Sequence, residues 1–275
     1  MKKLLKLIPL AMTLAVAVLA PAHAGAVHDA SLFTNVLPAN DDGSTGLVNL
    51  GFTANINGTN YTQTFVNNNG NITFNNPLGT FTPSAISSGV FGPIIAAYFA
   101  DVDTRASGSD PVRYGSAMLG GHNVFGVNYI NVGVYSALSI FNSFQMILTD
   151  RSDIAAGDFD IQFNYDRIVW EAGQASGSNS SGLGGTSALV GYWTSASSNA
   201  TLPGSLVNGA LLDGGPVGTS LIRNSLNSNI LGQYNFNVRN GAVVPPTGVP
   251  EPMSLALVGV ALAGMVAVSR FKRAA

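Results

Sequence analysis

The stretch DFDIQFNYD, residues 158–166, decides the fold class of this chain. Its apolar residues Phe159, Ile161, Phe163 and Tyr165 alternate with polar ones, which is the period-two pattern of a β-strand with one face in a core. We therefore predict a strand here, whose opposite face meets water or a ligand.

The rest of the body has the same character. From residue 31 to residue 241 no helical period appears, and short apolar or alternating runs are separated by glycine and asparagine. The run PIIAAYFA, residues 93–100, is apolar without alternation, as expected for a strand buried on both faces. Asn57-Gly58 and Asn69-Gly70 fit tight hairpin turns, because these residues tolerate positive φ. Further strands are predicted at residues 144–148, 189–193 and 233–238, and a Gly/Ser loop at 173–186.

These segments predict an all-β fold, a single β-sandwich-like domain of short, mostly antiparallel strands. We place this domain at residues 31–241 and a Pro/Gly linker at residues 242–248. The chain of 275 residues is long enough for such a core. It contains no cysteine, so disulfides, thiolate nucleophiles and Cys-based metal sites are excluded.

Charge is sparse and unevenly distributed. Only 9% of the residues are charged. Between residues 25 and 248, six arginines stand against twelve aspartates and Glu171, a net charge of −7, and there is no lysine. Binders of nucleic acid need basic patches, so we expect no nucleic-acid partner. Aspartate among asparagine, glycine and threonine is instead typical of turns and of sites for hard cations.

Residues 1–24 predict a secretory signal peptide. The segment MKKLLKLIPLAMTLAVAVLAPAHA has a basic start, an apolar centre and a small-residue exit at Ala22-His23-Ala24. We expect cleavage after Ala24, with an uncleaved N-terminal anchor as the alternative.

The C-terminal residues 249–273 predict a second targeting segment. A run of apolar or small residues from 253 to 269 would reach about 25 Å as a helix, the short limit for a transmembrane helix. The basic cluster that follows, residues 270–273, should stay on the cytoplasmic side. Pro250 and Pro252 favour an extended segment before the span, which a processing enzyme can bind. A plain membrane anchor, with the prolines as a spacer, is the alternative.

This arrangement resembles a known export signal. Val249-Pro250-Glu251-Pro252, the apolar span and the cluster of Arg270, Lys272 and Arg273 look like the PEP-CTERM sorting signal of Gram-negative bacteria. The resemblance implies recognition by an exosortase, a membrane transpeptidase-like enzyme. It also implies transient anchoring in the inner membrane and delivery to the cell surface or the exopolysaccharide matrix. Phe271 interrupts the basic run, which leaves the efficiency of sorting open.

The body resembles a second family. FVNNNGNITF, residues 65–74, is similar to the "VNnNGnlTF" core of nidogen-like (NIDO) domains, and IIAAYFADVDTR, residues 94–105, is similar to their "piIApfwaDvDtr" segment. Phe144-Gln145, residues 157–165 and Trp170-Glu171 follow in family order. NIDO domains occur in extracellular matrix, mucin-like and adhesive proteins, so the resemblance implies an adhesive or matrix role. The family is not associated with a catalytic activity, and the resemblance implies no catalytic residues.

Nucleophilic catalysis has little support in the sequence. After signal cleavage only His28 and His122 remain, and we expect His28 to lie at a frayed N-terminus. One usable histidine limits any Ser-His-Asp arrangement, and no Gly-x-Ser-x-Gly motif is present.

Paired carboxylates offer a second route to catalysis. Asp101 with Asp103, and Asp158 with Asp160, are two apart in extended segments, and Glu171 is the one glutamate of the body. Such residues are what a glycan hydrolase requires. Exposed aspartates on an acidic sheet face are the simpler interpretation, and we expect no enzymatic activity.

A structural Ca²⁺ is the cofactor hypothesis that these residues suggest. Asp101 and Asp103, followed by Asp110, offer the carboxylate oxygens that Ca²⁺ prefers, and so does the stretch NDDG at residues 40–43. Neither stretch has the spacing of an EF-hand. The alternatives are that these aspartates cap loop amides or pair with arginines such as Arg105.

The expected function is therefore that of an exported bacterial protein of the cell surface or exopolysaccharide matrix, structural or adhesive in role. Its expected partners are an exosortase-like enzyme, the inner membrane transiently, and exopolysaccharide or surface proteins. The first rival is a carbohydrate-binding module, in which exposed aromatic residues would stack on sugars. The second is an extracellular glycan hydrolase with paired carboxylates. The aromatic candidates for stacking are Tyr98, Trp170, Tyr192 and Trp193.

Overall fold

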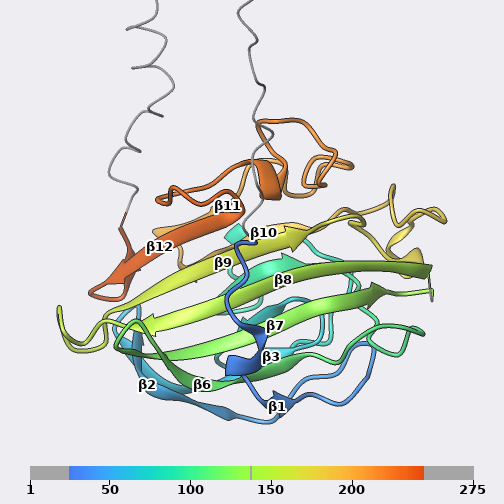
Figure 1. Cartoon of the computed structure of the whole chain (residues 1–275). Coiled ribbons are helices and arrows are strands. Elements are labelled where there is room, and N and C mark those ends of the chain that lie inside the picture. Colours follow the sequence, from blue (N-terminus) through green and yellow to red (C-terminus); the bar gives the residue numbers. More distant parts are fainter. Residues whose placement is uncertain (1–24, 137, 245–275) are drawn as a thin grey trace, which may run out of the picture.

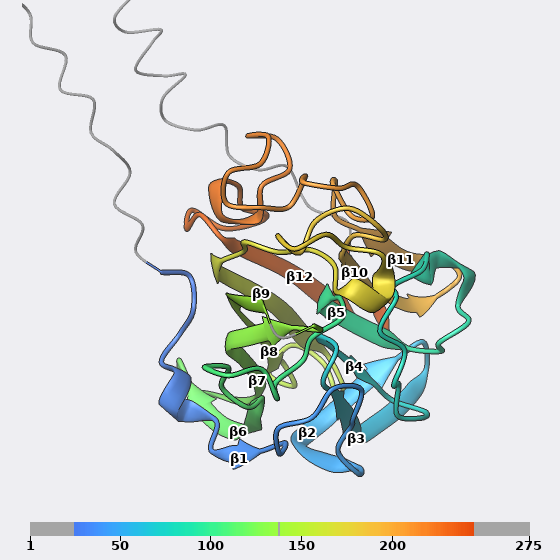
Figure 2. The ribbon, with the colours of Figure 1, turned by 90° about the vertical axis from the view of Figure 1, so that its right-hand side faces the viewer.

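Two antiparallel sheets packed face to face make up the domain, as predicted (Figure 1). This structure is a computed structural model that describes residues 25–136 and 138–244. Figure 2 shows the two layers from the side, with β6 to β9 in one and β2 to β5 in the other. The helical elements of the described residues are four 3₁₀ turns: η1 (Ala30–Leu32), η2 (Ile86–Ser88), η3 (Gln174–Ser176) and η4 (Leu221–Arg223).

Every pair of neighbouring strands is antiparallel. The seven-stranded sheet consists, in spatial order, of β1 (Asn35–Val36), β6 (Arg113–Leu119), β7 (His122–Val134), β8 (Leu138–Asp150), β9 (Phe159–Arg167), β12 (Gln233–Arg239) and β13 (Ala242–Val243). The six-stranded sheet consists of β11 (Ser198–Thr201), β10 (Leu189–Ser195), β5 (Ile94–Phe99), β4 (Asn71–Thr73), β3 (Thr59–Asn67) and β2 (Val48–Ile56).

The two targeting segments predicted at the ends of the chain, residues 1–24 and 249–273, lie outside the described residues. Within the described residues, no helix has the length and apolar character needed to cross a membrane. The expected span at residues 253–269 therefore stays a prediction.

The strand predicted at residues 158–166 is β9, and its apolar face is in the core as expected. Phe159, Ile161, Phe163 and Tyr165 are each at most 2% exposed. The opposite face meets water only in part: Asp166 is exposed, whereas Asn164 on the same face is buried. The cover is the N-terminal strap, residues 25–37, which crosses the outward face of the seven-stranded sheet in front of β7 to β9 (Figure 1).

The strap is held by polar and apolar contacts. The backbone N–H of His28 donates to Gln145 Oε1 at 3.0 Å, and His28 Nε2 lies 3.0 Å from Gln162 Oε1. Phe33 is fully buried in a small cluster on the same face of the sheet. The expectation that His28 lies at a frayed N-terminus is therefore wrong, since amide side chains of β8 and β9 bind it.

The strand predicted at residues 93–100 is β5, and all six of its residues are buried. Ile95 and Ala97 belong to the main core between the sheets. Ile94 and Ala96 belong to a second apolar cluster on the other face. The strand lacks alternation because both of its faces are covered.

Buried tyrosine hydroxyls connect the two sheets. Tyr129 on β7 donates to the carbonyl of Asn67 on β3 at 2.8 Å, and Tyr165 on β9 donates to the carbonyl of Ala97 on β5 at 2.6 Å. Each such bond contributes about 0.5–1.5 kcal/mol net, and losing it would leave a buried carbonyl unpaired. In a chain without disulfides, these bonds fix how one sheet lies on the other.

Both predicted Asn-Gly hairpin turns are present. Asn57 (φ 50°) and Gly58 (φ 83°) join β2 to β3, and the turn at Asn69-Gly70 joins β3 to β4. A Cβ atom on Gly70 would lie 1.8 Å from the carbonyl oxygen of Tyr98, so only glycine fits there. This close approach presses the β3–β4 turn against the end of β5, where the candidate site lies.

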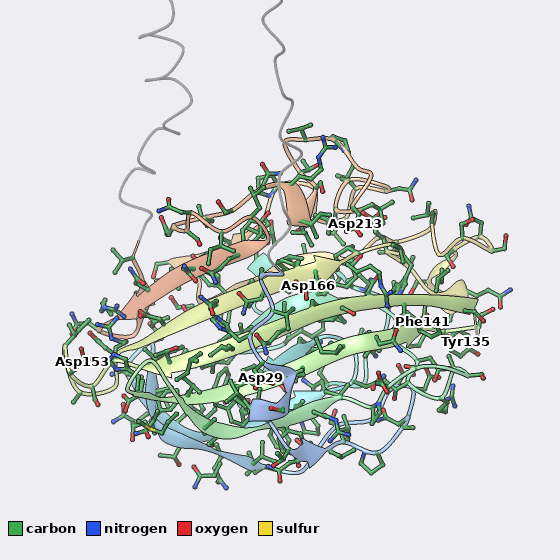
Figure 3. All side chains as sticks on the ribbon, in the orientation of Figure 1. Asp29, Tyr135, Phe141, Asp153, Asp166 and Asp213 are labelled. Carbon is green, nitrogen blue, oxygen red and sulfur yellow. The ribbon has the colours of Figure 1, made fainter. Side chains whose placement is uncertain are left out.

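Two details of the strands depart from the prediction. β7 and β8 contain 13 residues each, so they are longer than the short strands expected. They run from the end where Asp153 lies to the end where Tyr135 and Phe141 lie (Figure 3). At the other boundary, Ala242 and Val243 pair with the end of β12 as β13, so the sheet continues for two residues into the predicted linker.

Candidate functional site

Three aspartates from two distant segments meet beside the β3–β4 turn. Asp41 and Asp42 lie in the loop before β2, and Asp101 lies two residues after the end of β5. One carboxylate oxygen from each residue lies within 4.8 Å of the others. Asp101 is 1% exposed, Asp41 is half-buried, and Asp42 is the most exposed of the three. We call these three residues the acidic cluster.

The asparagines of the β3–β4 turn hold the two segments together. Asn69 Nδ2 donates to Asp42 Oδ1 at 2.8 Å, and Asn69 Oδ1 accepts from the backbone N–H of Val102 at 2.9 Å. Asn68 Nδ2 donates to the backbone carbonyls of Asp41 and Val102. The Asn-rich sequence of this turn predicts a hairpin but not this second role, because amide contacts with two remote segments depend on the fold.

Asp103 does not join Asp101, contrary to the predicted Ca²⁺ pair. Arg105 Nε donates to Asp103 Oδ1 at 2.9 Å, and Arg105 Nη2 donates to Asp103 Oδ2 at 2.8 Å. The same Nη2 lies 2.8 Å from Asp41 Oδ2. Asp103 is therefore the arginine-paired aspartate of the alternative interpretation, while Asp101 lies with two aspartates of the NDDG stretch, the alternative candidate for Ca²⁺. Asp110 is exposed and is not part of the cluster.

The electrostatics of the acidic cluster oppose full ionisation. Burial, together with the negative charges of Asp41, Asp42 and Asp103, raises the pKa of Asp101 to about 7. Burial also raises the pKa of Asp41 to about 6, together with Asp103 and Asp42, although Arg105 acts in the opposite direction. The Oδ2 atom of Asp101 and the Oδ1 atom of Asp41 are buried without a hydrogen-bond partner among the described residues.

The prediction of a sugar-stacking platform is wrong. Tyr98 and Trp170 are fully buried, and their rings meet edge to face with centroids 5.9 Å apart. Tyr192 is 7% exposed and packs in the core. Trp193 is half-buried against the apolar cluster that covers the outer face of β5. Aromatic residues of the strands serve packing here, and they do not line up on an exposed face.

The second carboxylate pair has structural partners. Asp158 is 2% exposed, and its Oδ1 accepts from the backbone N–H of Asn240 at 2.9 Å. Asp160 Oδ2 lies 2.8 Å from Arg151 Nη1, and Asp160 Oδ1 lies 2.6 Å from Arg239 Nη2. Both aspartates therefore fix the ends of β8, β9 and β12 to one another.

Glu171 is also engaged inside the protein. Its side chain is fully buried, with Oε2 accepting from the N–H of Gly209 at 2.6 Å and Oε1 accepting from the N–H of Leu211 at 2.7 Å. Burial raises its pKa, an effect that the two backbone hydrogen bonds oppose. The carboxylate anchors the loop after β11 to the segment after β9, and a substrate in solvent has no path to its engaged oxygens.

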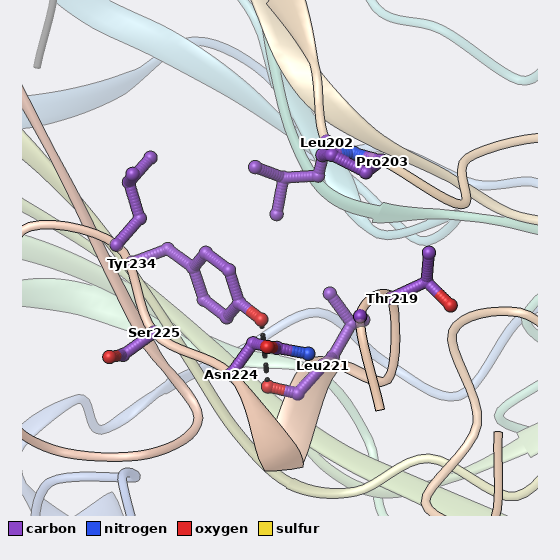
Figure 4. Close-up of a pocket in the computed structure, with 9 residues that line it drawn as sticks. Leu202, Pro203, Thr219, Leu221, Asn224, Ser225 and Tyr234 are labelled. Atoms are coloured by element: carbon purple, nitrogen blue, oxygen red, sulfur yellow. Dashed lines mark hydrogen bonds between the residues drawn. The ribbon is translucent and has the colours of Figure 1, made fainter. Parts of the chain in front are cut away.

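A small cavity lies between that loop and β12 (Figure 4). Its volume is about 220 Å³, and its lining includes Leu202, Thr219, Leu221 and Tyr234, with no charged side chain. The hydroxyl of Tyr234 already donates to the carbonyl of Leu221 at 3.0 Å. The cavity thus lacks the convergent titratable groups that catalysis requires.

A known family matches most of the chain. The family model described as "NIDO related" matches residues 24–209. This range includes the acidic cluster, both Asn-Gly turns and strands β1 to β11.

Curated relatives match over a similar length. Alpha-tectorin of Mus musculus is 29% identical over 239 residues, and alpha-tectorin of Homo sapiens is 28% identical over 239 residues; each alignment covers 77% of this chain. Alpha-tectorin of Gallus gallus is 29% identical over 236 residues. The chain spans only 10% of the length of these relatives. No solved structure matches the chain significantly.

Proposed function

Because the chain belongs to the NIDO-related family, we propose that it is an exported bacterial protein of the cell surface or exopolysaccharide matrix, in which the β domain is a structural or adhesive module. An exosortase-like enzyme sorts it through the C-terminal signal after transient anchoring in the inner membrane. The family resemblance supports the extracellular setting, and the sequence signals at the two ends support the route.

The observation that carries the proposal is the order of segments along the chain. A secretory signal at residues 1–24 precedes the β domain, and the last described strand, β13, ends at Val243. Pro250 of the Val249-Pro250-Glu251-Pro252 motif follows seven residues later. The sorting motif therefore lies just beyond the folded domain, where processing would leave the described contacts intact.

The role assigned to the domain is binding or structural, with no reaction of its own. Asp158, Asp160 and Glu171 have internal partners, which supports this role over a glycan hydrolase. The burial of Tyr98 and Trp170 removes the main support for a sugar-stacking module. Exopolysaccharide or other surface proteins are the proposed partners. The net charge of −7 between residues 25 and 248 supports the absence of a nucleic-acid partner.

The test is the mass of the C-terminus of the protein recovered from the surface, the medium and the inner membrane of its native host. We expect the surface form to end near Glu251-Pro252, and this form should disappear when the exosortase gene is deleted. The double substitution Pro250→Ala/Pro252→Ala should keep the chain in the inner membrane. Pro245→Ala/Pro246→Ala, which alters two prolines of the same segment outside the motif, is the matched control and should be sorted normally.

An intact tail, including Arg270 to Ala275, on wild-type protein confined to the inner membrane would contradict sorting. The β domain would then face the periplasm on a plain anchor. Equal sorting of the two double variants would likewise contradict a role for the motif.

A further inference from the structure

The acidic cluster carries charge that the folded chain does not neutralise. Asp41, Asp42 and Asp101 bring three carboxylates within 4.8 Å of one another. The charged groups that act on Asp101 are Asp41, Asp42 and Asp103, and all of them are negative. Arg105 offsets only part of this charge, because it is held bidentately by Asp103 and reaches the cluster through Asp41 Oδ2.

A buried carboxylate without a hydrogen-bond partner lies in this cluster. Asp101 is 1% exposed, and its Oδ2 has no partner among the described residues. Asp41 Oδ1 is in the same condition. A buried acceptor that lacks a donor is destabilising, and a buried charge is tolerated only when it is paired or coordinates a metal. A cation bound by the carboxylates of the cluster would compensate this buried negative charge.

The side chains of Asn68 and Asn69 limit how far the residues of the cluster can move apart. Asn69 binds the carboxylate of Asp42 and the backbone of Val102, and Asn68 bridges the backbones of Asp41 and Val102. The two segments that carry the carboxylates are thus held together by neutral donors, and moving these segments apart would break those hydrogen bonds.

We propose that Asp41, Asp42 and Asp101 together bind one Ca²⁺ ion. Carboxylate oxygens are hard ligands, and Ca²⁺ accepts six to eight of them in flexible geometry, with water or backbone carbonyls completing the shell. Mg²⁺ requires a stricter octahedron and gives up its water reluctantly, so it fits a loop site of this kind less well. Extracellular calcium modules bind with a Kd of about 0.1–1 mM, the affinity expected here.

The bound ion would join the loop before β2 to the segment after β5. Thr104 already makes reciprocal backbone contacts with Asn40 across the same two segments. Ca²⁺ would add a charged link beside these neutral ones. The inference concerns the β domain alone and does not depend on how the C-terminal signal is processed.

The experiment is isothermal titration of CaCl₂, and separately of MgCl₂, into the purified full chain after treatment with a chelator. The wild type should bind one Ca²⁺ per chain. Asp101→Asn and Asp42→Asn should each weaken Ca²⁺ binding by about tenfold or more, because each removes a charged ligand. Asp110→Asn is the matched control, since Asp110 is an exposed aspartate outside the cluster, and it should bind as the wild type does.

The Asp42 variant protects the test against a folding defect at buried Asp101, because Asp42 is the most exposed member of the cluster. Three results would overturn the proposal. The first is that the wild type binds no Ca²⁺ at about 10 mM, well above the expected Kd. The others are that Asp42→Asn binds Ca²⁺ with unchanged affinity, or that the wild type binds Mg²⁺ more tightly than Ca²⁺.

Discussion

Phe33 fastens the N-terminal strap to the sheet, and Gly126 on β7 makes room for its ring. A Cβ atom on Gly126 would lie 1.9 Å from Phe33 Cε2 and 2.0 Å from Phe33 Cζ, far inside contact distance. Gly126 has no positive φ, so alanine is compatible with the backbone and the conflict is purely steric. Gly126→Ala should therefore expel the Phe33 ring from its place above Val124 and Ile147.

The size of the effect follows from the buried ring. Burying a phenylalanine side chain stabilises a protein by about 1.5–3 kcal/mol, and removing one from a packed site costs about 3–5 kcal/mol. We expect Gly126→Ala and Phe33→Ala each to lower the free energy of unfolding by about 3 kcal/mol. Once Phe33 is alanine, the new methyl group at position 126 meets open space, so its further cost should fall to about 0.5 kcal/mol. The double variant should thus be about 2.5 kcal/mol more stable than the sum of the single effects predicts.

The assay is urea unfolding of the wild type, the two single variants and the double variant. Unfolding is followed by tryptophan fluorescence, to which the fully buried Trp170 contributes. Gly218→Ala is the matched control, because a Cβ atom there meets nothing within 4 Å and the φ angle is not positive. It should leave stability unchanged within about 0.5 kcal/mol. Additive costs of Gly126→Ala and Phe33→Ala, within about 0.5 kcal/mol, would refute the packing argument.

Four further results are expected. With a Kd of about 0.1–1 mM, about 10 mM CaCl₂ should stabilise the wild type by about 1.4–2.7 kcal/mol. Its Tm should then rise by about 3–10 °C; scanning calorimetry should show a clearly smaller rise for Asp42→Asn, whose weaker binding gives less stabilisation. Tyr165→Phe should lower stability by about 1–3 kcal/mol in urea unfolding, because the buried carbonyl of Ala97 loses its donor. Glu171→Ala should cost about 3 kcal/mol, since two buried N–H groups lose a carboxylate acceptor, and a cost below about 1 kcal/mol would contradict this. The raised pKa of Glu171 means that the folded state binds the proton of this side chain more tightly than the unfolded state does. The stability that this protonation adds is fully present below the unfolded pKa and is lost as pH rises through the folded pKa. The stability of the wild type relative to Glu171→Gln should therefore fall from pH 4 toward neutrality, and a rise would reverse the assigned direction.

The strands that could be predicted are those whose pattern is uninterrupted. β9 alternates over its whole length and β5 is apolar throughout, so both were placed to within about one residue. β7 was not predicted as a strand, because glycine and asparagine interrupt it. Asn131 adopts a φ of 56°, and the pairing with β8 shifts register between Tyr129 and Val132. A bulge of this kind breaks the period of two that a sequence pattern requires.

The sequence predicted that aspartates form the candidate site, but not which aspartates lie together. Asp101 and Asp103 were expected on the same side because an extended backbone was assumed to continue beyond β5. Instead the chain turns, and the N–H of Val102 donates to the carbonyl of Ala100 at 2.9 Å. The partners of Asp101 come from about 60 residues earlier, through the pairing of β3 with β4 and of β4 with β5. Local spacing carries no information about such long-range pairing.

The two processing steps proposed for the chain act on different kinds of boundary. The N-terminal strap is part of the domain: Ala26 is 5% exposed, and the N–H of Val27 donates to Asp166 Oδ1 at 3.2 Å, only a few residues beyond the expected cleavage after Ala24. The C-terminal boundary is looser, since β13 contributes only two residues to the sheet and Val244 is 40% exposed. A signal peptide retained at the first boundary would extend from a packed segment, whereas cleavage at Glu251-Pro252 would fall beyond every described contact. The proposed sorting would thus release the domain without altering its fold, and the proposed Ca²⁺ binding by the acidic cluster can be measured independently of where the chain is processed.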